Sequence, residues 1–374
     1  MDPITHAASG AVAMLALPRR PLTRWAVPLA ALAAASPDLD LVFVSTPLQF
    51  LLLHRGITHS LAAMPILGLL LALCCYPLWR STTPGRWNFG KVWLLTCAMV
   101  LLHIWLDVVT TYGTMIFLPF SHERVRLNGV FIIDLLLTLP LLWAVWRWRR
   151  KRGLMLLALA WVFVYPATGV GLNAWHAAQA EARLRAENRQ VSHLTILPDA
   201  FSPFFWRVLF EEQGPDGMLV REQSLNALGR PRAPETTHQA APARLTAELS
   251  RQSVTCETFF QFTLLPVMRP LRPEDAPKTP SGVQDAQNLL FYDLRFGSGL
   301  AFVRKIMALR PHADIPFQLM VEVAPAQAQS GAKTADMLLL RQRLRFSDSR
   351  RDSHWQLPRV PRPPSLAEWL VGLR

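Results

Sequence analysis

Residues 92–109 read VWLLTCAMVLLHIWLDVV, an apolar segment whose only imidazole and carboxylate belong to His103 and Asp107. The segment approaches the roughly 20 apolar residues that a helix needs to cross a membrane. Ionisable side chains are costly inside a membrane, and they commonly mark functional positions there. The sequence therefore predicts a membrane helix, and the four-residue spacing places His103 and Asp107 on the same face of it.

Similar apolar segments surround this one within the first 172 residues. We predict four full spans, at residues 61–79, 92–109, 130–146 and 153–170. Two shorter apolar segments, at residues 7–17 and 25–35, are predicted to form half-buried or tilted helices. The predicted fold is therefore mainly α, a multi-helix membrane bundle over residues 1–172.

The composition changes to that of a soluble domain from residue 173 onward. Helices are predicted at residues 173–189 and 243–264, and short strands at 191–197, 204–210, 218–223, 289–296 and 317–323. Pro-rich polar loops are predicted at 227–242 and 269–287, and a flexible tail at 348–364. We therefore expect an α+β domain over residues 173–374.

The overall composition supports a membrane protein. The 374 residues are 51% hydrophobic and only 17% charged, which excludes an ordinary soluble enzyme and a disordered chain. The formal net charge is +13, and the basic residues of the first half concentrate in alternate loops. These residues are Arg19, Arg20 and Arg24, then Arg80, Arg86 and Lys91, then Arg147, Arg149, Arg150, Lys151 and Arg152.

The positions of the basic loops predict an orientation. Under the positive-inside rule these loops face the cytoplasm, so the chain is multi-pass and its C-terminal domain is extracytoplasmic. The runs are short and flanked by spans, which favours anchoring to membrane lipids over binding to nucleic acid. We expect membrane lipids as partners and no nucleic acid.

Imidazole and carboxylate side chains gather at the outward end of the predicted bundle. They come from different segments but share this end: His6, Asp38, Asp40, His54, His59, His103 and Asp107. Scattered structural residues are not expected to sort to one side, and imidazole with carboxylate suits zinc or a similar divalent metal. The alternatives are that each His is a helix-packing hydrogen-bond donor and that Asp38 only forms a turn.

Four motifs carry a family resemblance. Asp2-Pro-Ile-Thr-His6, Ser-Pro-Asp38-Leu-Asp40, His54-Arg-Gly-Ile-Thr-His59-Ser and His103-Ile-Trp-Leu-Asp107 resemble, in this order, the YdjM family over about the first 170 residues. The resemblance implies a metal-dependent hydrolase in a bacterial inner membrane. It also implies a distant similarity to zinc-dependent phospholipase C and S1/P1-type nucleases, with His6, Asp38, His59, His103 and Asp107 as zinc ligands. His54 is a further candidate ligand.

The predicted chemistry is metal-assisted hydrolysis of a phosphoester or lipid-linked substrate at the outer membrane face. Asp40 or Asp107 is expected to orient or deprotonate a water molecule. Arg55 is predicted either to clamp a phosphate or to anchor a lipid headgroup. No Glu precedes Glu123, which argues against a peptidase of the HExxH type. The alternative is a non-catalytic membrane scaffold or binding protein with a structural metal site. Substrate, metal number and oligomeric state stay open at this point.

Overall fold

The computed structural model describes residues 1–80, 87–215, 217–278, 281–283, 285–309, 315–325, 337–346 and 353–372. Arg86 of the predicted basic loop and residues 348–352 of the predicted tail lie outside these ranges. The N-terminal helices are α1 (Pro3–Ala16), α2 (Ala26–Ala35), η1 (Ser36–Phe43), α3 (Pro47–Leu53), η2 (Ile57–His59), α4 (Met64–Trp79), α5 (Phe89–Val108), α6 (Leu135–Arg147) and α7 (Arg152–Ala186). The prediction of a helical N-terminal region is confirmed.

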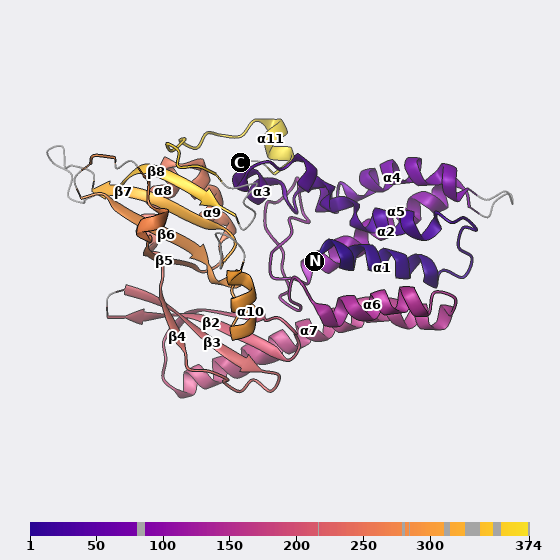
Figure 1. The fold of residues 1–374 in the computed structure, drawn as a ribbon, viewed down its shortest axis with the longest axis horizontal. Coiled ribbons are helices and arrows are strands. Elements are labelled where there is room, and N and C mark those ends of the chain that lie inside the picture. The colour runs from indigo at the N-terminus through magenta and orange to yellow at the C-terminus, as the bar shows by residue number, and fades with distance from the viewer. Residues whose placement is uncertain are drawn as a thin grey trace.

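The helices α1, α2, α4, α5 and α6 run side by side, and the C-terminal domain lies beyond one end of them (Figure 1). Small residues bring α1 and α2 together. A Cβ atom added at Gly10 would lie 2.5 Å from the carbonyl oxygen of Ala30 and 2.5 Å from the Cβ atom of Ala34. Close backbone approach of this kind is typical of helix pairs in membranes.

Within the described part of the chain, three helices are long and apolar enough to cross a membrane, by length and composition: Ala26–Phe43, Phe89–Val108 and Arg152–Ala186. The segments Pro47–His59 and Met64–Trp79, bent by 78°, make a fourth if they count as one span. The predicted count of four full spans is therefore not confirmed. The predicted short helix at 25–35 continues through η1, and the two helices predicted at 153–170 and 173–189 are one helix, α7. The domain boundary predicted at residue 172 lies inside α7.

The span predicted at 130–146 begins later than expected. The carboxylate of Asp134 accepts hydrogen bonds from the backbone N–H groups of Leu136 and Leu137, so it caps the N-terminus of α6. The remaining helix has 13 residues, fewer than the roughly 20 that a full span needs.

The C-terminal domain consists of two four-stranded antiparallel sheets. The first contains β1 (Val191–Pro198), β2 (Phe205–Gly214), β3 (Gly217–Asn226) and β4 (Thr236–Gln239) in that order. The second contains β5 (Pro266–Pro270), β6 (Gln287–Asp293), β7 (Gln318–Pro325) and β8 (Met337–Arg345). The helices are α8 (Ala243–Gln252), α9 (Val254–Phe262), α10 (Ala301–Ala308) and α11 (Leu366–Leu370), with 3-10 turns η3 (Pro273–Asp275) and η4 (Leu294–Phe296).

Three predictions for this domain differ from the structure. The helix predicted at 243–264 is broken at Ser253, whose hydroxyl accepts from the N–H of Thr255 and caps α9. The strand predicted at 289–296 ends at Asp293, which caps the turn η4. The Pro-rich loop predicted at 227–242 contains β4, and β5 overlaps the start of the loop predicted at 269–287.

The two parts of the chain share a core and a polar contact. Phe50 of α3 and Tyr112 belong to the same hydrophobic cluster as Phe262 of α9 and Phe317. Elsewhere the carboxylate of Asp134 accepts from the hydroxyls of Tyr165 and Ser202. The helix α7 also packs against both α1 and β1, so the C-terminal domain covers the end of the bundle where Asp107 lies (Figure 1).

Candidate metal centre

Four side chains from three segments converge inside the bundle: Asp38 of η1, His59 of η2, and His103 and Asp107 of α5. One ligand atom from each lies within 4.8 Å of all the others. The change from α-helix to 3-10 helix at Ser36 and the turn at Gly56 let η1 and η2 approach the C-terminal part of α5. The convergence expected from the shared outward position is therefore present in the structure.

Five of the six separations among these four atoms are close to the edges of a tetrahedral shell. Nε2 of His59 lies 3.0 Å from Nε2 of His103, 3.2 Å from Oδ2 of Asp107 and 3.4 Å from Oδ1 of Asp38. Nε2 of His103 lies 3.4 Å from Oδ2 of Asp107 and 3.5 Å from Oδ1 of Asp38. A tetrahedron with zinc–ligand bonds of about 2.0–2.1 Å has edges of about 3.3–3.4 Å.

Hydrogen bonding leaves the inward-facing atoms of the group available for a cation. Nδ1 of His103 donates to the carbonyl oxygen of Ala34 over 2.7 Å, which leaves the lone pair on Nε2. Nδ1 of His59 lies 2.9 Å from the hydroxyl of Thr58. Oδ2 of Asp107 is buried and has no hydrogen-bond partner among the described residues. If Nδ1 of His59 donates to Thr58, Nε2 of His59 also presents a lone pair, and a metal ion between the two rings and Oδ2 of Asp107 would replace the hydrogen bond that joins the two Nε2 atoms.

The other oxygen of Asp107 is held by cationic and imidazole groups. Oδ1 accepts from Nη2 of Arg55 over 2.9 Å, lies 3.3 Å from Nε2 of His6, and contacts the amino group of Met1. Nη1 of Arg55 donates to the hydroxyl of Thr110 over 2.8 Å. Since Arg55 is buried, its guanidinium orients Asp107 in this structure and does not line an open cavity.

His6 lies beside the four-atom group and is not one of its members. Its ring stacks on that of His103 with the centroids 3.6 Å apart. Neither ring nitrogen of His6 has a hydrogen-bond partner among the described residues. His6 therefore lies close to Oδ1 of Asp107, whereas His59 and His103 lie close to Oδ2, and its role as a ligand stays a prediction.

Asp40 organises a second group with Asp38 and His54. Its carboxylate lies 3.2 Å from Nδ1 of His54 and accepts from the backbone N–H of Arg55 over 3.2 Å. The side chains of Asp38, His54 and Asp40 are 11%, 10% and 7% exposed, whereas His59, His103 and Asp107 are fully buried. The edge formed by Asp38 and His54 is thus the most accessible part of the cluster.

Comparison with known proteins agrees with the motifs. Residues 1–178 match the YdjM inner membrane protein family. The resemblance of the N-terminal part of the chain to the YdjM family is thereby confirmed, and the matched region contains every member of the cluster. The uncharacterized protein YfhP of Bacillus subtilis (strain 168) is 30% identical over 116 residues, which cover 30% of this chain and 34% of YfhP. The chain thus spans about a third of the length of this relative. No solved structure matches the chain.

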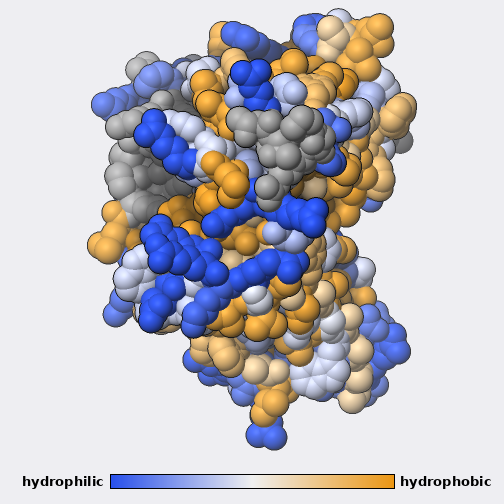
Figure 2. Space-filling model, turned by 90° about the vertical axis from the view of Figure 1, so that its right-hand side faces the viewer, coloured by the Kyte–Doolittle hydropathy of each residue, from blue (hydrophilic) through white to orange (hydrophobic). Residues whose placement is uncertain are grey.

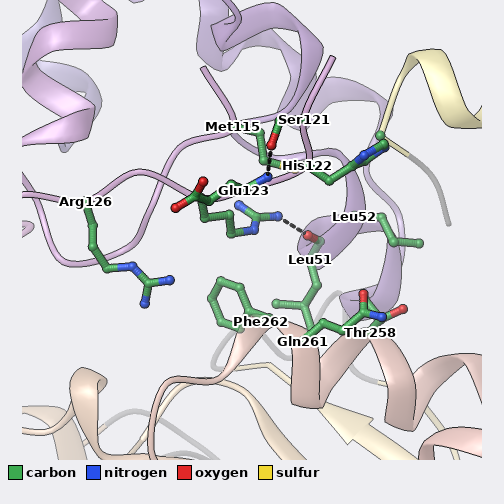
Figure 3. Close-up of a pocket in the computed structure, with 12 residues that line it drawn as sticks. Leu51, Leu52, Met115, Ser121, His122, Glu123, Arg126, Thr258, Gln261 and Phe262 are labelled. Atoms are coloured by element: carbon green, nitrogen blue, oxygen red, sulfur yellow. Dashed lines mark hydrogen bonds between the residues drawn. The ribbon is translucent and has the colours of Figure 1, made fainter. Parts of the chain in front are cut away.

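A cavity of about 540 Å³ lies where the YdjM region meets the C-terminal domain (Figure 3). Arg124 and Arg126 line it from the loop after α5, and Phe262 lines it from α9. Tyr112 separates this cavity from the cluster, because its ring lies 5.8 Å from the guanidinium of Arg124, 4.7 Å from that of Arg55 and 5.6 Å from the ring of His54. Burial raises the pKa of Tyr112 to about 12.

Sequence reasoning missed Tyr112, Arg124 and Arg126. Burial, followed by the charge of Arg295, lowers the pKa of Arg126 to about 10, so this guanidinium lies in a partly desolvated position. A signal was available, since Arg124 and Arg126 are the only Lys or Arg residues between Lys91 and Arg147. Basic residues in a loop that is otherwise poor in them are exceptions to the charge pattern that predicts topology.

Proposed function

We propose that this protein is a membrane-bound, divalent-metal-dependent hydrolase, with zinc as the metal and a phosphoester or lipid-linked compound as the substrate. The observation that carries the proposal is the close approach of Asp38, His59, His103 and Asp107, in which the five separations that involve an imidazole nitrogen run from 3.0 to 3.5 Å. Two imidazoles with two carboxylates form a zinc-type ligand set. A bound zinc ion supplies a water of lowered pKa and polarises a phosphoryl or acyl oxygen.

The residues of the cluster have two kinds of role. Some orient the side chains that would bind the metal, and others would exchange protons with the substrate or water. Arg55 holds Oδ1 of Asp107, so that Oδ2 faces His59 and His103. Asp40 fixes Nδ1 of His54 and leaves Nε2 of this ring for proton exchange. Because the Asp40–His54 pair lies at the accessible edge, we assign it the acid–base role, with Asp40 as the orienting carboxylate.

The surroundings of this edge favour a lipid-linked substrate. Leu39, Val42 and Phe43 of η1 are exposed apolar side chains, and Leu39 lies between Asp38 and Asp40 in the chain. η1 also ends a candidate membrane span. An apolar rim beside a polar, buried cluster suits a substrate with a polar reacting group and an acyl or isoprenoid tail.

Charge placement supports a position at the outer membrane face. The loop after α1 and the loop before α7, which carry Arg20, Arg24, Arg149 and Arg150, lie at the end of the bundle opposite the C-terminal domain (Figure 1). If the basic end faces the cytoplasm, the cluster and the C-terminal domain face outward.

Metal analysis combined with a hydrolysis screen tests the proposal. The full-length protein is purified in detergent, its metal content is measured, and it is assayed against phosphodiester, phospholipid and isoprenoid-phosphate substrates. We expect one zinc ion per chain and hydrolysis that a chelator removes and zinc restores. Bound zinc with no hydrolysis of any substrate class would favour the scaffold with a structural metal site. Purified protein that neither contains nor takes up metal would overturn both readings.

A further inference from the structure

A second polar cavity lies at the opposite end of the bundle from the metal cluster. It has a volume of about 600 Å³, and its basic lining residues are Arg20, Arg24, Arg149 and Arg150. Leu15, in the last turn of α1, also lines it, whereas His6 lies in the first turn of α1. Nine residues of helix separate these positions by about 14 Å along the axis, so the two sites are distinct.

The four arginines bring uncompensated charge to this cavity. The guanidinium of Arg24 lies over the ring of Trp25, 5.2 Å from its centroid. None of the four has a hydrogen bond or an ion pair among the described residues, and no acidic residue lines the cavity. Figure 2, which views this end of the molecule, shows strongly hydrophilic side chains gathered across the face beside hydrophobic ones. Guanidinium groups meet phosphate oxygens in a bidentate geometry, so four of them in one cavity favour an anionic, phosphate-bearing ligand.

Most of the other lining residues are apolar. Leu15 of α1, Val27 and Pro28 of α2, and Val145 of α6 line the cavity from helices of the bundle, and residues 21–23 line it from the loop between α1 and α2. A soluble phosphate gains nothing from contact with apolar side chains. The acyl chains of a lipid, in contrast, bury apolar surface against them. Basic pockets between membrane helices are a recognised form of lipid headgroup site.

We propose that this cavity binds the headgroup phosphate of an anionic glycerophospholipid, with the acyl chains lying along α2 and α6. The arginines come from two loops, the first joining α1 to α2 and the second joining α6 to α7. One phosphate held by both loops links the N-terminal helices to α7, which runs on to the C-terminal domain. The lipid is thus a structural ligand, and its binding does not depend on the metal cluster.

Lipid titration of the full-length protein in a neutral detergent tests the site, with bound lipid counted by native mass spectrometry. The probes are phosphatidylglycerol, phosphatidylcholine and inorganic phosphate. We expect phosphatidylglycerol to bind in preference to phosphatidylcholine, and a large molar excess of inorganic phosphate to leave it bound. The double variant Arg20→Gln/Arg149→Gln should weaken phosphatidylglycerol binding roughly 30-fold.

The matched control is Arg80→Gln/Arg147→Gln, which removes the same charge near the same end without touching the cavity lining. It should change phosphatidylglycerol binding less than about threefold, because a diffuse surface charge contributes little in neutral detergent. A second cavity pair, Arg24→Gln/Arg150→Gln, tests the proposal if the first pair does not fold. Equal losses in cavity and control pairs, no preference for phosphatidylglycerol, or displacement of the lipid by inorganic phosphate would each overturn it.

Discussion

Nε2 of His59 and Nε2 of His103 lie 3.0 Å apart, although 44 residues separate the two histidines in the chain. Nδ1 of His103 donates to the carbonyl of Ala34, so Nε2 of this ring presents a lone pair. Two imidazole nitrogens and Oδ2 of Asp107 therefore face one another in a fully buried space. A shared cation would relieve this crowding, and its binding would then be linked to the stability of the bundle.

Metal removal should consequently destabilise the protein. A ligand present at 100 times its dissociation constant stabilises the folded state by about 2.7 kcal/mol. We expect a chelator to lower the Tm of the full-length protein in detergent, and added zinc to restore it. The His59→Ala variant is the control, because it lacks a ligand and its Tm should not respond to the chelator. If the chelator left the Tm of the unmodified protein unchanged, the cluster would not hold a metal ion that stabilises the fold.

Truncation of either ligand on α5 should remove the metal. His103→Ala and Asp107→Ala each delete one of the four atoms, so both variants should lose bound metal and any hydrolytic activity. His176→Ala is the matched control, since His176 is also a fully buried histidine of a long helix but lies outside the cluster.

Stability is the confounding factor in this comparison. Hydrogen bonds between membrane helices contribute around 0.6 kcal/mol on average, so the variants are compared at equal folded amounts. Full metal content in His103→Ala would mean that the His-x-x-x-Asp face of α5 does not bind metal.

Reporter fusions should place the two ends of the bundle on opposite sides of the membrane. The basic residues at 147–152 predict a cytoplasmic loop, and the chain leaves α7 for β1 near residue 190. A reporter that is active only outside the cytoplasm should work when fused near residue 190 and fail when fused at residue 150. A cytoplasmic reporter that is active at residue 190 would reverse the orientation, and with it the outer-face position of the cluster.

The pair Arg207–Glu222 should make the C-terminal domain sensitive to acid. Although burial raises the pKa of Glu222, the charge of Arg207 and the hydrogen bonds of His238 and Arg207 lower it to about 2. A carboxylate with a depressed pKa stabilises the folded state above its ordinary pKa of 4.5, and this stabilisation disappears as the pH falls toward 2. The shift corresponds to about 3 kcal/mol.

Urea unfolding of the full-length protein at a series of pH values checks this expectation. Glu222→Gln should be less stable than the unmodified protein at pH 7, and the two should converge as the pH falls below about 4. Glu211→Gln serves as the control, because Glu211 of β2 has no ion pair among the described residues. A constant difference between Glu222→Gln and the unmodified protein at all pH values would contradict the assignment.

Local geometry explains what the sequence predicts well. The four-residue spacing of His103 and Asp107 predicts their shared face, because helix periodicity depends only on the chain between them. The alternation of apolar segments and basic loops predicts that Asp38 and His59 reach the same end of the bundle. The short apolar strands β1 and β7 likewise lie within two residues of their predicted limits, whereas β2 begins one residue after its predicted start and runs four residues beyond its predicted end.

Contacts between distant segments explain what the sequence does not predict. The start of α6 depends on Asp134, which is also bound by the hydroxyl of Ser202 from the other half of the chain. The role of Asp40 depends on its contact with His54 across a turn. The placing of Arg124 beside Tyr112 and Phe262 depends on the docking of α9, which no local pattern specifies.

Substitutions of Arg55 should separate the orientation of Asp107 from backbone strain. Nη2 of Arg55 donates to Oδ1 of Asp107 over 2.9 Å. The backbone of Arg55 has a φ of 58°, which is unfavourable for any residue with a Cβ atom. Arg55→Ala and Arg55→Gly should both lower metal affinity about 10–100-fold, as expected when a partner that orients a ligand is removed. Zinc content at saturation should stay unchanged, because a guanidinium cannot bind a cation. Arg55→Gly should be the more stable of the two by about 1 kcal/mol, because glycine adopts this φ without steric cost.

Zinc titration and urea unfolding of both variants measure the two effects. If Arg55→Ala bound zinc as tightly as the unmodified protein, Arg55 would not orient Asp107, and a direct contact with an anionic substrate would become its better assignment.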